Sequence, residues 1–224
     1  MFIQQILHKP ELSKADIVCL LNATGEDMEL LFNHAARIKQ QYIGNTVHLR
    51  ALVELSNSCE KDCYYCGIRK SNSNVHRYSI SENEVLEVIK YAYENGYGSV
   101  ALQSGEIQSN AFTEKITRIL QKTSKLTHRE LGVTLSCGEQ TEETYRKWME
   151  AGANRYLLRI ETSNPELYRK LHPNDDIHRF ERRLEALEML KKTGYQTGTG
   201  VMIGLPFQTI EYLADDLLFM KQFD

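Results

Sequence analysis

The 224-residue chain has no run of about 18 consecutive apolar residues, the length that a membrane-spanning helix needs. Its first residues, Met1–His8, lack a basic stretch followed by a sustained apolar segment, so we expect no secretory signal peptide. The net charge is −3 and the lysines and arginines are scattered, which argues against nucleic acid as the main partner. Together these absences predict a cytoplasmic protein that binds neither membrane nor nucleic acid.

Cysteine is also scarce. There are five cysteines, an odd number, and three of them lie in one short segment. A chain of this length with 42% hydrophobic residues can build a core without covalent staples, so we do not expect a disulfide framework. No internal repeat or low-complexity segment is present.

The three clustered cysteines are the most informative feature. Cys59, Cys63 and Cys66 follow the apolar segment 49–55 after only three residues. Three thiolates this close can surround one soft metal centre, and a [4Fe–4S] cluster with three cysteine ligands keeps one iron open for a small molecule. A closed zinc site is the first alternative, but no second CxxC and no HxxxH occurs. The sequence favours the cluster, with zinc or three unrelated buried cysteines as the other readings.

Helical and strand patterns alternate along the chain. Two helices are expected between Ser13 and Tyr42, and five strand–helix units follow, with strands at 47–55, 99–103, 131–136, 155–160 and 196–203. The helices between and after them are expected at 81–93, 111–122, 141–151, 179–192 and 209–222. Such alternation predicts an α/β fold in which helices surround a parallel sheet.

We expect a (β/α) barrel of the TIM type, reduced to about five βα units after a helical segment. Residues 1–46 would form the helical extension and residues 47–224 the partial barrel. A closed barrel has eight units, and the sequence stops in a helix, which predicts a fragment whose activity alone is doubtful.

Each chemically suggestive group comes directly after an expected strand. These groups are the cysteine segment, Gln103–Glu106, Ser136–Glu139 and Glu161–Asn164. The carboxyl ends of the strands form the active-site face of α/β barrels, so the four groups should converge at one site.

With the spacing CxxxCxxC in place, the chain resembles the radical S-adenosylmethionine (SAM) enzymes. Within this superfamily it is similar to the biotin-synthase-like branch, and most to the HydE type of [FeFe]-hydrogenase maturase. The stretches that carry the resemblance are Cys66–Arg69, Leu102–Glu106, Val133–Glu139, Arg155–Thr162 and Gly194–Pro206. The cysteine motif alone specifies only the superfamily, whereas the later stretches are much more specific.

The resemblance implies a role for individual residues. Cys59, Cys63 and Cys66 would hold a [4Fe–4S] cluster whose open iron is chelated by the amine and carboxylate of SAM. The other expected SAM contacts are Tyr65 at the adenine, Gln103, Ser104, Gly105 and Glu106 at the methionine amine, Glu161 at the ribose, Arg183 at the carboxylate, and Met202 beside the adenine. The substrate candidates are Thr134, Ser136 and Arg159.

Plainer readings remain open for three of these groups. Gln103–Glu106 could be an ordinary turn, Glu161 an acid at a helix N-terminus, and Arg183 part of a solvated helix face that also holds Arg179 and Arg182. The sequence departs from the maturase pattern at Phe207, where the family usually has glycine.

The implied activity is reductive cleavage of SAM to methionine and a 5′-deoxyadenosyl radical. The resemblance implies a small-molecule substrate, specifically an iron–cysteine precursor of the hydrogenase di-iron subcluster. It also implies a one-electron donor such as flavodoxin or ferredoxin, and other hydrogenase maturases as partners. The alternatives are a methylornithine synthase, a biotin-synthase-like enzyme or, in a different class, a non-catalytic Fe–S electron carrier.

Overall fold

The structure, a computed structural model, describes residues 2–222. The chain divides into two compact units. One comprises residues 1–48, 162–167 and 201–224, and the other comprises residues 49–161 and 168–200. The predicted division at residue 46 stays a prediction.

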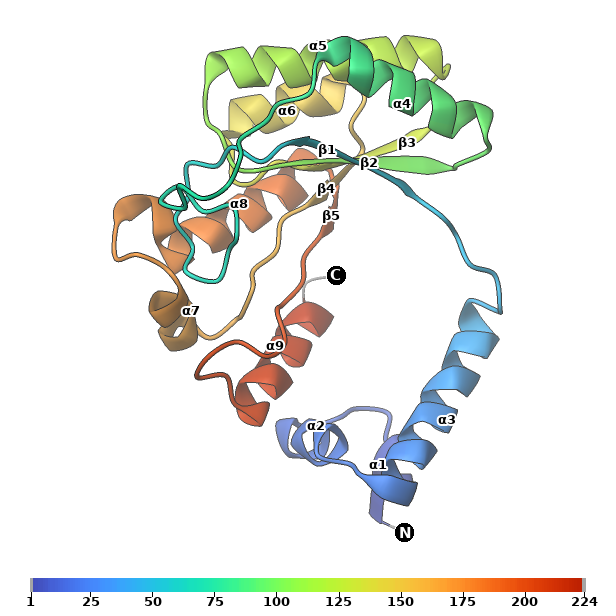
Figure 1. Ribbon diagram of the computed structural model, residues 1–224. Coiled ribbons are helices and arrows are strands. Elements are labelled where there is room, and N and C mark those ends of the chain that lie inside the picture. The colour runs from blue at the N-terminus through green and yellow to red at the C-terminus, as the bar shows by residue number, and fades with distance from the viewer. Residues whose placement is uncertain (1, 223–224) are drawn as a thin grey trace. The chain divides into compact units, whose positions relative to one another are not determined.

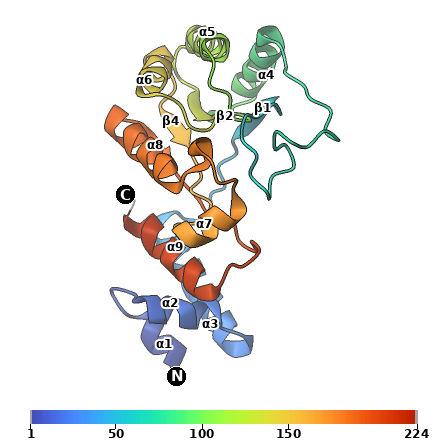
Figure 2. The same ribbon diagram turned by 90° about the vertical axis from the view of Figure 1, so that its left-hand side faces the viewer.

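The larger unit, residues 49–161 and 168–200, is built on a parallel sheet with the strand order β1-β2-β3-β4-β5. The strands are β1 (Ala51–Ser56), β2 (Ser99–Ser104), β3 (Gly132–Ser136), β4 (Arg155–Leu157) and β5 (Gln196–Gly198). The helices that separate them are α4 (Glu82–Glu94), α5 (Asn110–Leu126), α6 (Glu142–Ala151) and α8 (Phe180–Thr193). These helices follow one another around the outside of the sheet (Figures 1 and 2). The expected α/β architecture is confirmed.

Local sequence signals explain where these helices begin and end. Ser81 and Glu84 form a capping box at the start of α4, in which each side chain accepts a hydrogen bond from the backbone of the other. The helix α8 ends at Thr193 and is capped by Gly194, whose φ of 101° lies in the left-handed region that glycine adopts at low cost.

The core of this unit contains a cluster of aromatic side chains. Trp148 stacks on Tyr156 with ring centroids 6.5 Å apart, and Tyr145 and Tyr195 meet Tyr156 edge to face. Trp148, Tyr145 and Tyr156 are at most 1% exposed. The Tyr156 hydroxyl donates to the Gly138 carbonyl at 2.8 Å, so the cluster also fixes the loop that follows β3.

The strands differ from the expected ranges at their ends. The first strand begins at Ala51 and not at residue 47, because Val47 and Leu49 are 76% and 69% exposed and bury no apolar face. The strands β4 and β5 end earlier than expected, at Leu157 and Gly198. Three short helices were not expected: α1 (Phe2–Leu7), α7 (Pro165–Leu171) and the 3₁₀ helix η1 (Asp176–His178).

The smaller unit is helical. The helix α2 (Lys14–Leu21) packs against α9 (Ile210–Gln222), and α1 packs against α3 (Gly25–Tyr42). Lys14 pairs with Asp215 at 2.7 Å, and the buried Asp216 carboxylate accepts from the Ser163 hydroxyl at 2.7 Å. Between residues 2 and 222, none of the helices combines the length and the apolar character that crossing a membrane requires.

Candidate metal centre

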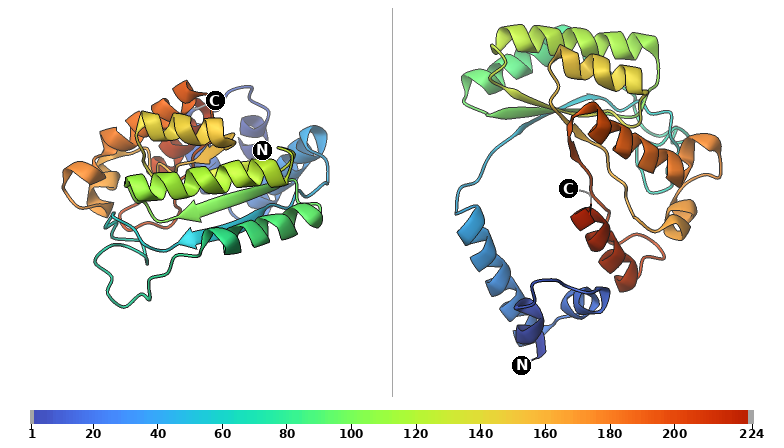
Figure 3. Two further views of the ribbon diagram at one scale, coloured as in Figure 1. Left: turned by 90° about the horizontal axis from the view of Figure 1, so that it is seen from above. Right: turned by 180° about the vertical axis from the view of Figure 1, so that it is seen from behind.

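The three clustered cysteines lie in the loop that follows β1. Seen from above, the arrowheads of β1 and β2 point towards this loop (Figure 3, left). All three are free thiols; Cys63 is buried, and Cys59 and Cys66 are half-buried. The backbone N–H of Cys66 donates to the Cys63 carbonyl at 3.0 Å, which closes a tight turn between the last two cysteines.

The environment of the thiols disfavours a bare thiolate. Burial raises the pKa of Cys59, although backbone N–H groups of Lys61 and Glu106 oppose the rise, and burial raises the pKa of Cys63 to about 11. A bound metal would reverse this, because coordination deprotonates a thiol outright.

The spacing of the ligands indicates what the loop can hold. Among the described residues, no three His, Cys, Asp or Glu side chains come close enough to hold one metal ion. Tetrahedral zinc with Zn–S bonds of about 2.3 Å needs its sulfur atoms about 3.8 Å apart. A cubane takes each thiolate on a different iron, so its ligands stand wider apart. The loop supplies three cysteines, the ligand number that leaves one iron of a [4Fe–4S] cluster open.

A second loop packs tightly against the cysteines. A Cβ atom added at Gly105, just after β2, would lie 2.2 Å from the Ser58 carbonyl oxygen and 2.8 Å from the Cys59 Cβ. The next residue, Glu106, donates its backbone N–H to the Cys59 Sγ at 3.3 Å. Only a glycine allows the two loops to approach this closely.

The Glu106 side chain belongs to a buried network of charges. Its carboxylate lies 3.3 Å from the Lys61 ammonium and 4.0 Å from the Arg183 guanidinium. Glu139, in the loop after β3, pairs with Lys61 at 3.0 Å and with Arg183 at 2.7 Å. These four residues are at most 8% exposed, and Arg182 extends the network to Glu139 at 3.0 Å.

The two carboxylates have opposite pKa shifts. Burial, and then the negative charge of Glu139, raise the pKa of Glu106. For Glu139 burial acts in the same upward direction, but the charges of Arg183 and Lys61 overcome it and hold the pKa below its usual value. The charges of Arg183 and Lys61 thus favour the ionised form of Glu139, whereas burial disfavours the ionised form of Glu106.

Glu161 comes shortly after β4 and has an unusual environment. Its φ of 67° lies in the left-handed region, and its carboxylate is buried. Arg159 lies 3.1 Å from its Oε2, yet this atom has no hydrogen bond in the described structure. Burial raises the pKa of Glu161, with Arg159 and Arg183 opposing the rise. The ion pair with Arg159 thus leaves the hydrogen-bonding capacity of this buried acceptor unused.

Tyr65 joins the cysteine loop to these charges. Burial raises the pKa of its hydroxyl far above the ordinary range, Glu161 and Cys63 add to the rise, and Arg183 opposes it. Arg183 also donates to the Arg159 carbonyl at 3.0 Å. The structure thus brings together Tyr65, Glu161, Arg159 and Arg183, which the sequence had placed after the first strand, at the end of the fourth strand and in the helix 179–192.

The segment 171–178 holds the cysteine loop from the other side. The Leu171 carbonyl accepts from the Tyr64 N–H at 3.0 Å, and His178 Nε2 accepts from the Asp62 N–H at 2.8 Å. His172 donates from Nδ1 to the Tyr168 carbonyl, so its Nε2 accepts from the Tyr65 hydroxyl at 3.2 Å. Burial lowers the pKa of His172 to about 4, which keeps this ring neutral.

The remaining predicted residues are less connected. Gln103 and Ser104 end β2, and Ser136 ends β3. Thr134 is buried in β3, and its hydroxyl has no hydrogen-bond partner in the described structure. Met202 belongs to the smaller unit, so its predicted contact with the adenine stays a prediction.

Sequence reasoning placed Glu139 in one of the groups expected at the site but gave it no role, and it missed Lys61, His172 and His178. Glu139 had a detectable signal, because Gly138-Glu139 after β3 repeats the Gly105-Glu106 pair after β2. Lys61 and the two histidines had none, since nothing local indicates that they are buried against the loop.

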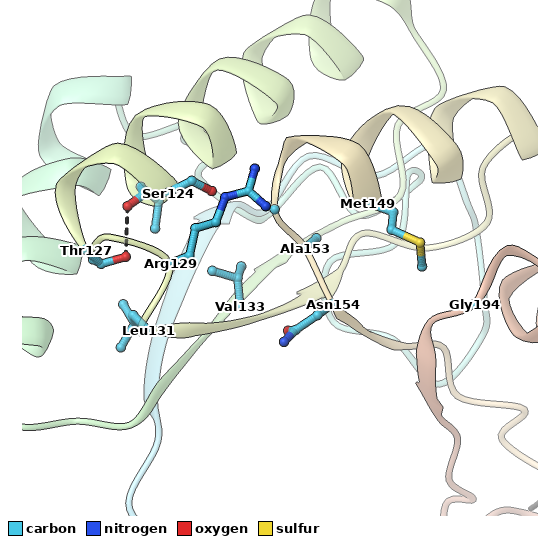
Figure 4. Close-up of a pocket in the computed structure, with 11 residues that line it drawn as sticks. Ser124, Thr127, Arg129, Leu131, Val133, Met149, Ala153, Asn154 and Gly194 are labelled. Atoms are coloured by element: carbon cyan, nitrogen blue, oxygen red, sulfur yellow. Dashed lines mark hydrogen bonds between the residues drawn. The ribbon is translucent and has the colours of Figure 1, made fainter.

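A cavity of about 330 Å³ lies at the opposite end of the strands (Figure 4). Its lining includes Leu131 just before β3, Val133 near the start of β3, Asn154 just before β4 and Gly194 two residues before β5. The amino ends of barrel strands usually serve stability, so this cavity is separate from the metal centre.

Comparison with known proteins identifies the family. Residues 53–220 match the Radical SAM superfamily, a range that contains all three clustered cysteines. The chain belongs to this superfamily. The membership confirms the resemblance drawn from the CxxxCxxC spacing and the strand-end motifs.

Several relatives are similar to this radical SAM chain. It is 47% identical, over 88% of its length, to the [FeFe] hydrogenase maturase subunit HydE of Thermotoga maritima, and covers 54% of that protein. It is 29% identical to the 3-methylornithine synthase of Methanosarcina acetivorans, with 100% of this chain and 62% of the relative covered. The chain thus spans little more than half the length of these relatives.

The solved structures agree. A methylornithine synthase (PylB) structure superposes with a TM-score of 0.87 and 26% identity, over 100% of this chain and 65% of the other. The hydrogenase maturase HydG gives a TM-score of 0.81 and 25% identity, over 98% of this chain and 49% of the other. The parallel sheet with outer helices is therefore the radical SAM fold.

Proposed function

We propose that this chain forms the cluster- and SAM-binding part of a radical SAM enzyme of the HydE type, which acts in the maturation of [FeFe]-hydrogenase. The observation that carries the proposal is the placement of Cys59, Cys63 and Cys66 in one loop at the carboxyl end of β1, with Glu106 donating to a cysteine sulfur. The 47% identity to a HydE protein supports the specific type.

The residues of this chain and the groups that it binds have different roles in the proposed reaction. Cys59, Cys63 and Cys66 hold a [4Fe–4S] cluster by three irons. When bound, the reduced cluster and SAM supply one electron and a 5′-deoxyadenosyl radical, with methionine as the other product. The protein supplies position, charge and exclusion of water.

The SAM contacts follow from burial and charge. The buried Glu161 Oε2, which has no hydrogen bond in the described structure, accepts from the ribose hydroxyls. Arg183 presents a guanidinium for the SAM carboxylate, and the rest of its donors hold Glu139 and the Arg159 carbonyl. Tyr65 borders the adenine, and Gln103–Glu106 borders the methionine amine. Met202 remains the proposed second adenine contact.

The substrate side is proposed from three polar residues. Thr134 offers a buried hydroxyl without a hydrogen bond in the described structure. Ser136 ends β3, and Arg159 lies two residues beyond the end of the neighbouring strand β4. We propose an iron–cysteine complex as the substrate, flavodoxin or ferredoxin as the electron donor, other hydrogenase maturases as partners, and the cytoplasm as the location. Residues 47–224 would be the partial barrel that carries all of these contacts.

The test begins with anaerobic reconstitution. We expect about four irons and four sulfides per chain, loss of the cluster on substitution of Cys59, Cys63 or Cys66 by Ala, and retention in the Cys19→Ala and Cys137→Ala controls. Added SAM should change the EPR spectrum of the reduced cluster, and reductant should release 5′-deoxyadenosine. Stoichiometric zinc without a cluster, or a spectrum indifferent to saturating SAM, would overturn the proposal, and the latter would favour an electron carrier.

A second candidate is a methylornithine synthase, which the TM-score of 0.87 over the whole chain favours. The two candidate functions can be separated by adding this chain to a hydrogenase maturation system that lacks its HydE-type maturase. Restored hydrogenase activity supports the maturase. Formation of 3-methylornithine without restored hydrogenase activity supports the synthase.

A further inference from the structure

Lys61 lies between the first two cysteines and is the only residue of that interval whose side chain is buried. It is 3% exposed, whereas Glu60 is exposed and Asp62 is half-buried. Lysine is rarely buried to this degree unless it is paired. The burial therefore indicates that the loop is built around this side chain.

The Lys61 ammonium meets three acceptors from three different parts of the chain. It lies 3.3 Å from the Glu106 carboxylate and 3.0 Å from the Glu139 carboxylate, and it donates to the Ile177 carbonyl. An ammonium has three hydrogens to donate, so these contacts match its full capacity. One side chain thus connects the cysteine loop to the loops after β2 and β3 and to η1.

The need for this cation follows from the register of the sheet. The strands β2 and β3 run parallel, with Gln103 opposite Ser136. Continued by the same offset, this register sets Gly105-Glu106 beside Gly138-Glu139. The Glu139 N–H donates to the Glu106 Oε2 at 2.9 Å. Both carboxylates also lie within 3.3 Å of the Lys61 ammonium, so they are close neighbours. Two buried carboxylates at this distance destabilise the fold unless cations lie between them.

Two arginines supply part of this compensation. Arg183 is 2.7 Å from Glu139 but 4.0 Å from Glu106, and Arg182 contacts Glu139 from a side chain that is 32% exposed. Lys61 is therefore the closest cation to Glu106. Without it, a buried negative charge would remain beside three thiolates and the cluster that they hold.

We propose that Lys61 is a positioning residue of the metal centre. Its ammonium fastens the cysteine loop to Glu106 and Glu139, and its fixed positive charge offsets the negative charge that gathers around the cluster. This inference rests on the proposed function, because it assumes that the cysteine loop holds a [4Fe–4S] cluster. It adds to that function a residue that is neither a ligand of the cluster nor a contact of SAM.

The first measurement uses the metal-free protein and the Lys61→Met variant. Chymotrypsin can cleave after Tyr64, whose side chain is 57% exposed, once the loop opens. Loss of a charge-assisted hydrogen bond in a buried site should make this cleavage about tenfold faster or more. The matched control is Lys70→Met, an exposed lysine of the same loop, whose cleavage rate should equal that of the wild type.

The second measurement is the reduction potential of the reconstituted cluster, followed by EPR. Removal of a nearby positive charge disfavours the added electron, so Lys61→Met should shift the potential to more negative values. In the double variant Lys61→Met/Glu139→Gln one positive and one negative charge are removed together, and the potential should return towards that of the wild type. A lysine that only fills space would leave the potential of the single variant Lys61→Met unchanged.

The outcomes separate this inference from the proposed function. If the wild type takes up no cluster, the proposed function fails. If the wild type takes up the cluster and Lys61→Met matches Lys70→Met in both cleavage rate and potential, the role of Lys61 is wrong. If the loop opens in Lys61→Met but the potential does not move, or the double variant shows no recovery, the electrostatic part of the proposal is overturned.

Discussion

The backbone N–H of Asp62 donates a hydrogen bond of 2.8 Å to Nε2 of His178. Because Nε2 is the acceptor, the ring proton lies on Nδ1, which faces the Asp175 carboxylate at 2.7 Å. A residue far along the chain thus holds the middle of the cysteine loop, and a carboxylate fixes the orientation of its ring.

We expect His178→Phe to loosen the cysteine loop, because the hydrogen bond between Asp62 and His178 is lost. The substitution keeps a ring but leaves the Asp62 N–H without its acceptor, which costs about 1–3 kcal/mol in a buried site. The reconstituted cluster should be lost to a chelator several-fold faster, while circular dichroism stays unchanged. His178→Gln, which offers an acceptor, should recover part of the stability, and the exposed His76→Gln should behave as the wild type. Equal rates for all four proteins would contradict this role.

Gly105→Ala should prevent the close approach of the two loops. Its Cβ would lie 2.2 Å from the Ser58 carbonyl oxygen, a contact with backbone that no rotamer change relieves. We expect a loss of about 1–3 kcal/mol in the free energy of unfolding and poor uptake of iron and sulfide. Gly67→Ala is the matched control, because its Cβ has nothing within 4 Å and it lies beside Cys66. Similar iron content in the two variants would refute the packing argument.

Arg183→Met should destabilise the protein far more than Arg179→Met. Arg183 is buried and pairs with Glu139 at 2.7 Å, whereas Arg179 is exposed. Removal of one partner of a buried ion pair costs about 3–5 kcal/mol. Chemical denaturation measures this difference, and SAM binding to the reconstituted protein should also weaken about ten- to a hundredfold in Arg183→Met. Equal losses of stability and of SAM affinity at the two positions would mean that Arg183, like Arg179, belongs to a solvated helix face.

Glu161→Gln should stabilise the SAM-free protein in a pH-dependent manner. Burial raises the pKa of Glu161 above 4.5, so the folded state binds its proton more tightly than the unfolded state does. Its contribution to stability is therefore present below about pH 4.5 and is lost as the pH rises through the folded pKa. The melting temperature of Glu161→Gln should exceed that of the wild type near neutral pH, and the gap should close in acid. SAM affinity should fall in the same variant. If the difference in melting temperature between Glu161→Gln and the wild type widened in acid, the pKa of Glu161 would be lowered in the folded state, and this prediction would be wrong.

Phe207→Gly should stabilise the chain. Phe207 has a φ of 66°, which costs a residue with a side chain about 1–2 kcal/mol, and it is 68% exposed. Glycine removes this strain but adds about 0.5–1 kcal/mol of chain entropy to the unfolded state, so we expect a net gain of about 0.5–1 kcal/mol by denaturation. Gly204→Ala, at a φ of 87°, should change stability in the opposite direction. The strain also explains why glycine is usual in the family at position 207.

The sequence alone determined the properties that depend on residues close together in the chain, namely the order of strands and helices and the cysteine motif. Alternating apolar patterns fixed the sequence of strands and helices, because a parallel sheet needs a helical crossover between successive strands. The spacing of Cys59, Cys63 and Cys66 identified the superfamily, since three thiolates in one short loop are a local property. Glu161 and Arg183 were assigned to SAM by the family resemblance, and these roles stay predictions; the structure adds that both residues are buried.

Only the tertiary structure decided which charges meet. Lys61 looks in the sequence like one more surface lysine, and its burial depends on the register of β2 and β3, which sets Glu106 beside Glu139. His178 carries no signal in the sequence for the same reason: its partner, the Asp62 backbone, lies in a different loop, and no local pattern records that contact. Side chains that meet across strand ends carry no periodic signal, so the electrostatics of this metal centre become visible only in the folded chain.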